Sequence, residues 1–399
     1  MKNILIICST LNAGGAAKIV SNLTRHLPEE WGIDILLNSD ENIEFSYRGK
    51  IISLDIPEPK SRISFLYQGE VFLKRWTVIL KLKRQKHYKA CISFMDSANI
   101  VNILTGSRYC NVIINIVNNM SAQGKNIPVY RWVVCPLIRM FYNRADKIVA
   151  VSEEVKKDIV SNFGVNPQKV TSILCSIDIE DIDNQIKCDV TEFEKIWFSK
   201  EKTVITAGRM EKQKGQWHLI RAFSRVLEQI PDAKLVIFGN GSLEGYLKKL
   251  VRDYHMESSV LFYGFNKNLD KYISRSAVFV FPSLYEGLSM TILEALACSV
   301  PCIATDCSSG TKEQLAPGYM GGIVGYYKAE YGIIVEKSSE EMPDASVALD
   351  CSEQGMADAI VELLKSEDIR RYYANKARER SKVYDAERIG EQWLEIIEK

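Results

Sequence analysis

The chain has 399 residues, of which 46% are hydrophobic and 25% are charged. These values are ordinary for a globular protein, and they exclude a disordered chain, a collagen-like fibre and a coiled coil. Because a domain usually takes about 100–200 residues, the length predicts two domains.

The net charge is close to zero, with 51 Lys and Arg against 50 Asp and Glu. This balance argues against a general nucleic-acid-binding protein, so we expect no nucleic-acid partner. The two halves differ, however. Residues 1–180 carry 23 basic and 16 acidic residues, whereas residues 181–399 carry 28 and 34. The N-terminal half is therefore expected to favour an anionic partner.

Short apolar runs alternate with amphipathic stretches over nearly the whole chain. In the first half the runs are Ile4–Cys8, Asp34–Leu37, Ile51–Leu54, Cys91–Phe94, Val112–Ile114, Ile148–Val151 and Val170–Leu174. In the second half they are Val204–Ala207, Lys234–Phe238, Val260–Phe262, Val278–Phe281, Cys302–Thr305 and Gly332–Val335. Short β-branched runs separated by helical patterns predict βαβ units, and therefore an α/β protein with doubly wound parallel sheets.

The clearest break in this alternation lies between Leu174 and Lys202, where the chain reads DIEDIDNQIKCDVTEFEK. We expect this acidic and polar stretch to connect the two domains. The predicted division is an N-terminal domain over residues 1–175, a linker over 176–202, a second domain over 203–383, and a C-terminal helical segment over 384–399, able to pack across both domains.

Ten cysteines lie mostly in apolar runs, which predicts buried free thiols in a reducing compartment. The first apolar run, Ile4–Cys8, is too short for the core of a signal peptide. No apolar stretch reaches the roughly 18 residues that a membrane span needs. We therefore expect an intracellular protein.

Residues 71–89, VFLKRWTVILKLKRQKHYK, contain seven Lys and Arg and no acidic residue, with apolar side chains at roughly helical spacing. This pattern is typical of a helix that lies on an anionic membrane surface. An ordinary domain helix with a solvated basic face has the same pattern, so both interpretations stay open. The segment Val129–Tyr142 adds Trp132, Arg131 and Arg139.

The first motif with chemical meaning is STLNAGGAAKIV, in which Gly14 and Gly15 separate a strand from a helix. Glycines at such a turn let backbone N–H groups approach a phosphate, and the helix N-terminus favours negative charge. The spacing G-x-G-x-x-G of dinucleotide-binding proteins is absent. A simple turn without a ligand is the alternative.

The second motif, TAGRMEKQKGQWHLIRAF, places two cations after the strand Val204–Ala207. Arg209 and Lys214 lie where open α/β sheets place their ligands, and two cations there suit a diphosphate. The alternative is a solvated basic loop. His218 is expected on the surface of the helix that follows.

The third motif, FVFPSLYEGLSMTILEALACSVPCIATDCSSG, is the strongest. Glu286 lies in the loop after a buried strand, and Glu294, eight positions later, falls about one turn inside the following helix. Glu294 can accept two hydrogen bonds from a ribose diol, and Glu286 can face a second polyol. The helix N-terminus between them presents N–H groups to a phosphate. The alternative is that both glutamates are surface residues.

At these residues the sequence resembles the retaining glycosyltransferases of bacterial family four. The resemblance covers most of the chain and rests on NAGGAAKIV, NRADKIVAVSEEVKKDI, GRMEKQKG, IFGNGSLEGYL and the E-x7-E block with ATDCSSGTKE. It implies the GT-B fold, in which two Rossmann-like domains face each other across a central donor cleft.

The resemblance also implies the reaction and the residues that perform it. A hexose or N-acetylhexosamine is transferred from a nucleotide sugar, expected to be UDP-linked, and the configuration at the anomeric carbon is retained. The implied catalytic residues are Arg209, Lys214 and Glu286. The implied donor-binding residues are Gly15, Arg209, Lys214, Glu286, Gly287, Leu288, Ser289, Met290, Thr291 and Glu294. Members of this fold usually need no metal, and no cofactor is expected.

The segments DCSSGTKEQLAPG and AEYGIIV resemble a subset that builds capsule, exopolysaccharide or O-antigen. This implies a lipid-linked glycan acceptor and a cytoplasmic protein peripheral to the inner face of the cell membrane. The sequence departs from the family where Ala17 replaces a common Glu, where LCSID at 174–178 lacks the common Asn-Pro, and where Val117 replaces a His or Arg. We therefore name no general base.

Two alternatives to a glycosyltransferase remain at this point. One is a sugar-nucleotide epimerase, which can share the fold and needs no acceptor. The other is a non-catalytic subunit that binds a nucleotide sugar within a polysaccharide-synthesising complex.

Overall fold

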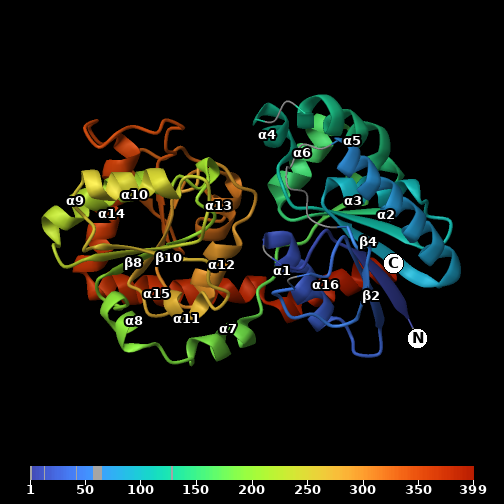
Figure 1. Ribbon diagram of the computed structural model, residues 1–399, viewed down its shortest axis with the longest axis horizontal. Helices are drawn as coiled ribbons and strands as arrows, with labels where there is room; N and C mark the ends of the chain where they lie inside the picture. Colours follow the sequence, from blue (N-terminus) through green and yellow to red (C-terminus); the bar gives the residue numbers. More distant parts are fainter. Residues whose placement is uncertain (1, 13, 42, 57–64, 127–128) are drawn as a thin grey trace. The chain divides into compact units, whose positions relative to one another are not determined.

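The computed structural model describes residues 2–12, 14–41, 43–56, 65–126 and 129–399 (Figure 1). The chain forms two compact units. Unit 1 comprises Met1–Ser176 and Asp385–Lys399, and unit 2 comprises Ile177–Tyr384. Each unit is built on a seven-stranded sheet with helices packed on it, which confirms the predicted α/β class.

The sheet of unit 1 has the order β3-β2-β1-β4-β5-β6-β7, and all neighbouring strands are parallel. Its strands are β1 (Asn3–Ile7), β2 (Gly32–Leu37), β3 (Lys50–Ser53), β4 (Tyr88–Phe94), β5 (Asn111–Ile116), β6 (Lys147–Ala150) and β7 (Val170–Ser172). The order reverses between β1 and β4, so the loops after these strands diverge there. Open α/β sheets bind their ligands at such a point.

The helices of unit 1 cover this sheet because each buries one apolar stripe. They are α1 (Gly15–His26), α2 (Phe65–Gln85), α3 (Asp96–Leu104), α4 (Met120–Asn126), α5 (Cys135–Phe141), α6 (Glu153–Phe163) and α16 (Ala386–Glu398). The C-terminal helix α16 is part of unit 1. It packs on α1 and β4, and the ring of Trp393 lies 6.1 Å from that of Phe94.

Unit 2 has the sheet order β10-β9-β8-β11-β12-β14-β13. Its strands are β8 (Thr203–Ala207), β9 (Lys234–Phe238), β10 (Val260–Gly264), β11 (Val278–Phe281), β12 (Cys302–Thr305), β13 (Tyr326–Lys328) and β14 (Ile333–Val335). Its longer helices are α9 (Gln216–Gln229), α10 (Glu244–Asp253), α12 (Met290–Ala297), α14 (Cys351–Lys365) and α15 (Glu367–Ser381). All strands run parallel except β13, an edge strand antiparallel to β14 that the sequence did not predict.

All ten cysteines are free thiols, and eight of them are buried, as their apolar surroundings predicted. Within the described parts of the chain, we find no helix that combines the length and the apolar character needed to cross a membrane.

The linker was expected over residues 176–202, but residues 177–202 belong to unit 2 and include α7 (Ile179–Ile186) and α8 (Glu192–Trp197). The acidic side chains that suggested a solvated connection have specific partners. Asp183 accepts a hydrogen bond of 2.6 Å from Arg378, and Thr191 and Glu194 form a reciprocal capping box at the start of α8. Capping side chains satisfy N–H groups that the first helical turn leaves free.

Glu194 attaches α8 to the rest of unit 2. Its Oε1 accepts hydrogen bonds of 2.5 Å from the hydroxyls of both Tyr263 and Tyr272, and its Oε2 accepts one from the backbone N–H of Thr191. Burial of Glu194 acts to raise the pKa of its carboxyl. These hydrogen bonds and the nearby Lys271 outweigh burial and hold the pKa at about 2. The ionised form is therefore the one that the fold binds.

We predict that Glu194→Gln lowers the free energy of unfolding at pH 7 by about 3 kcal/mol, because the pKa lies well below its ordinary value of 4.5. A carboxyl whose pKa is lower in the folded state than in the unfolded state stabilises the fold fully at pH values above its unfolded-state pKa. The difference between variant and wild type should therefore narrow as the pH falls from about 4.5 towards 2. Urea unfolding at several pH values measures both effects. Glu192→Gln is the control, since the Glu192 side chain is 89% exposed and should change little. An equal effect of both variants would contradict the assignment.

Candidate functional site

The predicted donor-site residues of unit 2 follow neighbouring parallel strands. Arg209 and Lys214 follow β8, Glu286 follows β11, and β12 leads into α13 (Ser309–Leu315). Because β8, β11 and β12 are adjacent and parallel, the loops after them meet at one edge of the sheet. The sequence thus placed these residues on the elements where the structure has them.

Lys214 and Glu286 form an ion pair at this edge. Lys214 Nζ lies 2.5 Å from Glu286 Oε1, and the two side chains are 19% and 15% exposed. The ammonium group also lies 5.3 Å from the centre of the Phe281 ring. The sequence predicted both residues but not the bond between them. A diphosphate that binds Lys214 would have to compete with Glu286 for the same cation.

The backbone of the Lys214 loop approaches its neighbours closely. Gly215 has φ of +57°, and a Cβ there would lie 2.3 Å from the carbonyl oxygen of Pro282. Any other residue at 215 would push the Lys214 turn away from the loop after β11. Arg209, which follows the carboxyl end of β8, is exposed to solvent.

The helix α12 begins at Met290, and Ser289 caps it by accepting a hydrogen bond from the N–H of Ile292. Glu294 lies in the second turn and is 7% exposed. The backbone of Ser289 is itself bound: its N–H donates to Gln314 at 3.4 Å, and its carbonyl accepts from the same amide at 2.7 Å. Gln314 therefore fixes the turn whose N–H groups the resemblance assigns to the donor.

Gly287 is packed against α13. A Cβ at Gly310 would lie 1.8 Å from the carbonyl oxygen of Gly287, so only glycine at 310 allows this approach. The hydroxyl of Ser308, the N-cap of α13, donates to the same carbonyl oxygen at 3.4 Å. Leu288 is buried, whereas Met290 and Thr291 are half-buried.

Gly15 lies in unit 1, at the first position of α1. Gly14 before it has φ of +110°, a conformation that suits glycine. The helix carries no acidic residue in its own first turn. Such an end is able to receive an anion.

His218 is fully buried, so the expectation that it lies on a helix surface was wrong. Its Nδ1 lies 2.8 Å from Glu353 Oε1, and its Nε2 lies 2.9 Å from the carbonyl oxygen of Ser339. Asp350 is close enough to complete a candidate metal-ligand group with His218 and Glu353. The guanidinium of Arg221 also binds Glu353 Oε1, at 2.8 Å. The negative charge of Glu353 is already compensated by the nitrogen atoms of His218 and Arg221. We therefore assign this cluster a role in the stability of the fold.

Comparison with known proteins identifies the class. The family model described as "Glycosyl transferases group 1" matches residues 189–342, and the one described as "Glycosyltransferase Family 4" matches residues 117–181. The crystal structure of Anabaena HepE in complex with UDP and glucose has the same fold, with a TM-score of 0.73, 16% identity, and coverage of 100% of this chain and 99% of HepE. The fold is therefore that of the GT-B glycosyltransferases.

Sequence relatives define the family. An uncharacterised glycosyltransferase of Methanocaldococcus jannaschii is 31% identical over 351 residues, which cover 85% of this chain and 86% of the relative. The N-acetylgalactosamine-N,N'-diacetylbacillosaminyl-diphospho-undecaprenol 4-alpha-N-acetylgalactosaminyltransferase of Campylobacter jejuni is 28% identical over 410 residues, which cover 100% of both chains. The chain belongs to the group 1 glycosyltransferases, as its motifs indicated.

We predict that Gly310→Ala displaces the Glu286–Gly287 loop, because the added Cβ cannot fit against the Gly287 carbonyl. The variant should melt at a lower temperature and bind UDP more weakly than wild type. Gly245→Ala is the control, since a Cβ at this helical position meets no atom within 4 Å. That change should be neutral or slightly stabilising. Unchanged melting and UDP affinity in Gly310→Ala would contradict the prediction.

Proposed function

We propose that the protein is a retaining glycosyltransferase that moves a hexose or N-acetylhexosamine from a UDP-sugar to a lipid-linked glycan acceptor during surface polysaccharide synthesis. The observation that carries this proposal is the ion pair of Lys214 and Glu286 at the sheet edge, beside the N-terminus of α12. The name of the Campylobacter relative supports the acceptor class, and the UDP bound to HepE supports the nucleotide.

In this proposal the donor replaces the ion pair. Its diphosphate draws Lys214 away from Glu286, and Arg209 adds a second cation. The carboxylate of Glu286, released from Lys214, accepts hydrogen bonds from hydroxyls of the donor sugar. Glu294 binds the ribose. Backbone N–H groups of Gly287, Leu288, Met290 and Thr291 and the turn at Gly15 complete the contacts to sugar and phosphate.

The reaction breaks the bond between the anomeric carbon and the diphosphate oxygen. Negative charge develops on that oxygen, and Lys214 and Arg209 stabilise it, an effect that usually contributes more to catalysis than any other. The acceptor hydroxyl attacks the anomeric carbon on the same face and gives its proton to the departing phosphate. Since the proposal assigns two protein cations to the developing charge, it needs neither a metal nor a cofactor.

Two other functions would give different results in the tests. A sugar-nucleotide epimerase would convert a UDP-sugar without an acceptor, so product analysis of the donor alone identifies it. A non-catalytic subunit would bind the nucleotide sugar without turnover. Membership of the glycosyltransferase family favours transfer over both.

We predict that UDP binds in the presence of EDTA and that two substitutions shift its affinity in opposite directions. Lys214→Ala should weaken binding roughly 10- to 100-fold, the effect of losing one charge-assisted hydrogen bond. Glu286→Gln should strengthen UDP binding, because it frees the cation, while transfer of the sugar is lost. Isothermal titration calorimetry with UDP and GDP measures the affinities.

Lys212→Ala is the matched control, since Lys212 lies on the same turn and pairs only loosely with Glu340, at 3.5 Å. It should bind UDP like wild type. Preference for GDP would keep the site but change the donor class. Binding that depends on divalent metal, or that Lys214→Ala leaves intact, would contradict the proposed donor site.

We also propose that unit 1 binds an anionic membrane surface, which fits a cytoplasmic, membrane-peripheral protein. In the structure, some basic residues of the segment 71–89 are buried and others are exposed to solvent. Arg75 and Lys83 are buried: Arg75 donates to Ser97 and Ser9, and Lys83 to Asn102. The remaining cations include Lys81 and Arg84, which are exposed, as are Leu73 and Trp76.

The segment 129–142 also presents exposed apolar side chains and cations. Trp132 is 74% exposed, the guanidinium of Arg131 stacks on its ring, and Val133 and Met140 are exposed as well. No acidic residue occurs between residues 129 and 145. Exposed apolar side chains with neighbouring cations are the combination that anionic lipid surfaces bind.

We predict that the protein sediments with vesicles of phosphatidylglycerol and phosphatidylethanolamine but not with phosphatidylcholine alone. The double variant Lys81→Gln/Arg84→Gln should bind roughly 30-fold more weakly, at about 1 kcal/mol for each cation. Lys195→Gln/Lys200→Gln, on exposed positions of unit 2, is the matched control. Equal loss in both double variants would indicate a general charge effect and remove the role of α2.

A further inference from the structure

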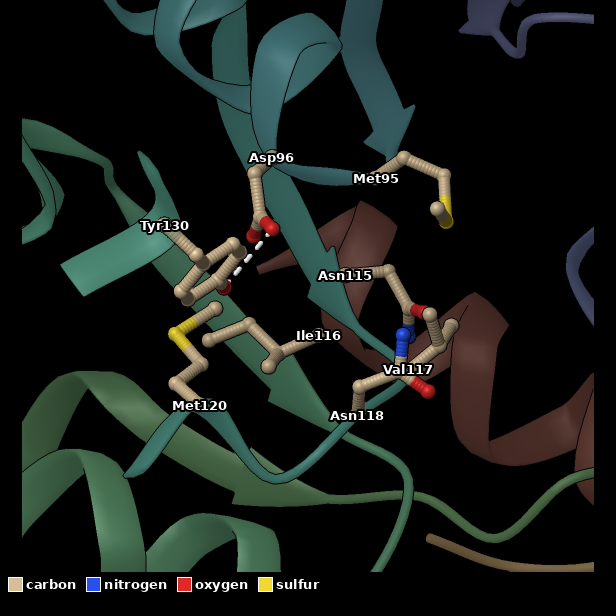
Figure 2. A pocket seen from close by; sticks show the side chains of 8 residues that line it. All are labelled: Met95, Asp96, Asn115, Ile116, Val117, Asn118, Met120 and Tyr130. Carbon is tan, nitrogen blue, oxygen red and sulfur yellow. Dashed lines mark hydrogen bonds between the residues drawn. The ribbon is translucent and has the colours of Figure 1, made fainter. Parts of the chain in front are cut away.

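The carboxylate of Glu286 is held by a partner that the nucleotide sugar is proposed to remove. Among the described residues, Lys214 alone bonds to it, at 2.5 Å. Asp96 in unit 1 is held differently, because its carboxylate accepts hydrogen bonds from two neutral hydroxyls, those of Tyr130 (Figure 2) and Tyr142. No described side chain does this for Glu286. Once Lys214 turns to a diphosphate, the position of Glu286 therefore depends on its backbone.

The backbone that leads to Glu286 is bonded at two points to Gln213, the residue before Lys214. The N–H of Leu284 donates to the carbonyl oxygen of Gln213 at 2.8 Å, and Gln213 Nε2 donates to the carbonyl oxygen of Tyr285 at 3.0 Å. The second bond joins residues that are 72 positions apart in the chain. Gln213 thus connects the loop after β8 with the loop after β11 through neutral groups.

The hydrogen bond to Tyr285 acts directly on Glu286, because the two residues share one peptide group. A peptide group is planar, so the direction of the Tyr285 carbonyl also fixes the direction of the Glu286 N–H. The Cα of Glu286 is attached to the same plane. The amide of Gln213 therefore limits the positions from which the Glu286 side chain can extend.

The turn that carries Gln213 is itself fixed. Gln213 is the middle residue of a 3₁₀ turn over Lys212–Lys214. Just before this turn, the carboxylate of Glu211 accepts hydrogen bonds from the N–H and the hydroxyl of Ser242, at 3.1 and 2.8 Å. Because Ser242 follows β9, the turn is attached to a third loop at the same edge of the sheet. It is therefore a firm support for the side chain of Gln213.

The hydrogen bonds of Gln213 do not involve the charges that the nucleotide sugar rearranges. The ion pair of Lys214 and Glu286 breaks in the proposed function, whereas bonds between an amide and the backbone persist. Before binding, they keep Glu286 close to Lys214 and so strengthen its competition with a diphosphate. After binding, they keep the freed carboxylate beside the sugar.

We propose that Gln213 is a positioning residue that holds Glu286 at the sheet edge both before and after the ion pair with Lys214 breaks. The inference rests on the proposed function, in which Glu286 binds hydroxyls of the donor sugar. Gln213 acts through Glu286 and touches neither the sugar nor the diphosphate. It therefore lowers the affinity for UDP alone and raises the preference for a complete UDP-sugar.

The test replaces Gln213 by methionine, which has a similar shape but cannot donate the hydrogen bond. Calorimetry measures the affinities for UDP, UDP-glucose, UDP-galactose and their N-acetylhexosamine counterparts. Gln213→Met should bind UDP roughly 2-fold more tightly, because Glu286 competes less well for Lys214. The preference for the UDP-sugar that binds wild type best, relative to UDP, should fall roughly 2- to 10-fold, the effect of one lost hydrogen bond.

A double variant shows whether Gln213 acts through Glu286. Glu286→Gln/Gln213→Met should bind UDP and the UDP-sugar like Glu286→Gln alone, because no carboxylate remains to be positioned. Such a cycle measures the coupling between two residues. A residue that only supports the turn would change the affinities equally with and without the Glu286 carboxylate.

Gln354→Met is the matched control. Gln354 is exposed in unit 2, and its Nε2 donates to the carbonyl oxygen of Leu349 at 2.8 Å. The substitution thus removes the same kind of hydrogen bond from residues outside the candidate donor site. It should leave the affinities for UDP and for the UDP-sugar unchanged.

The inference is overturned if Gln213→Met weakens UDP binding, since the turn that carries Lys214 would then have moved, or if the preference for the UDP-sugar stays at the wild-type level. It is also overturned if wild type prefers none of the four UDP-sugars to UDP, because Glu286 would then hold no sugar. If UDP does not bind wild type, or if Lys214→Ala leaves UDP binding intact, the proposed function fails as well.

Discussion

The candidate donor site depends on one geometric constraint: parallel strands deliver their carboxyl ends to the same edge of a sheet. In unit 2, β8, β11 and β12 are neighbours, so loops separated by nearly a hundred residues meet. Gly215 and Gly310 then bring those loops within contact of one another, since a Cβ at either position would overlap a backbone carbonyl. The side chains proposed as catalytic are thus placed by backbone packing that larger residues would prevent.

The ion pair of Lys214 and Glu286 is the electrostatic consequence of that placement. Two opposite charges of low exposure compensate each other at the sheet edge. In the proposed function, a diphosphate supplies a stronger partner for the cation and leaves the carboxylate for the sugar hydroxyls. The proposal therefore links the binding of phosphate and the binding of sugar through one pair of residues, and it expects Glu286 to favour a complete nucleotide sugar over the nucleotide alone.

The sequence predicted those features that depend on local pattern. Every apolar run named as a strand overlaps a strand, because buried parallel strands are continuous apolar runs. The antiparallel edge strand β13 was missed, since Tyr326–Lys328 has no such run. The segment 177–202 was misjudged as a linker because Glu194 binds Tyr263 and Tyr272, which lie some seventy residues further along the chain. His218 was misplaced for the same reason, as its partner is Glu353.

The buried hydrogen bonds around Asp96 in unit 1 could not be predicted from the sequence for the same reason. A carboxylate after an apolar strand is typical of an ordinary helix N-terminus, and nothing nearby shows that Tyr130 and Tyr142 both donate hydrogen bonds to it. The candidate donor-site residues of unit 2 differ, because they directly follow apolar strands, and the position of those strands is visible in the local pattern.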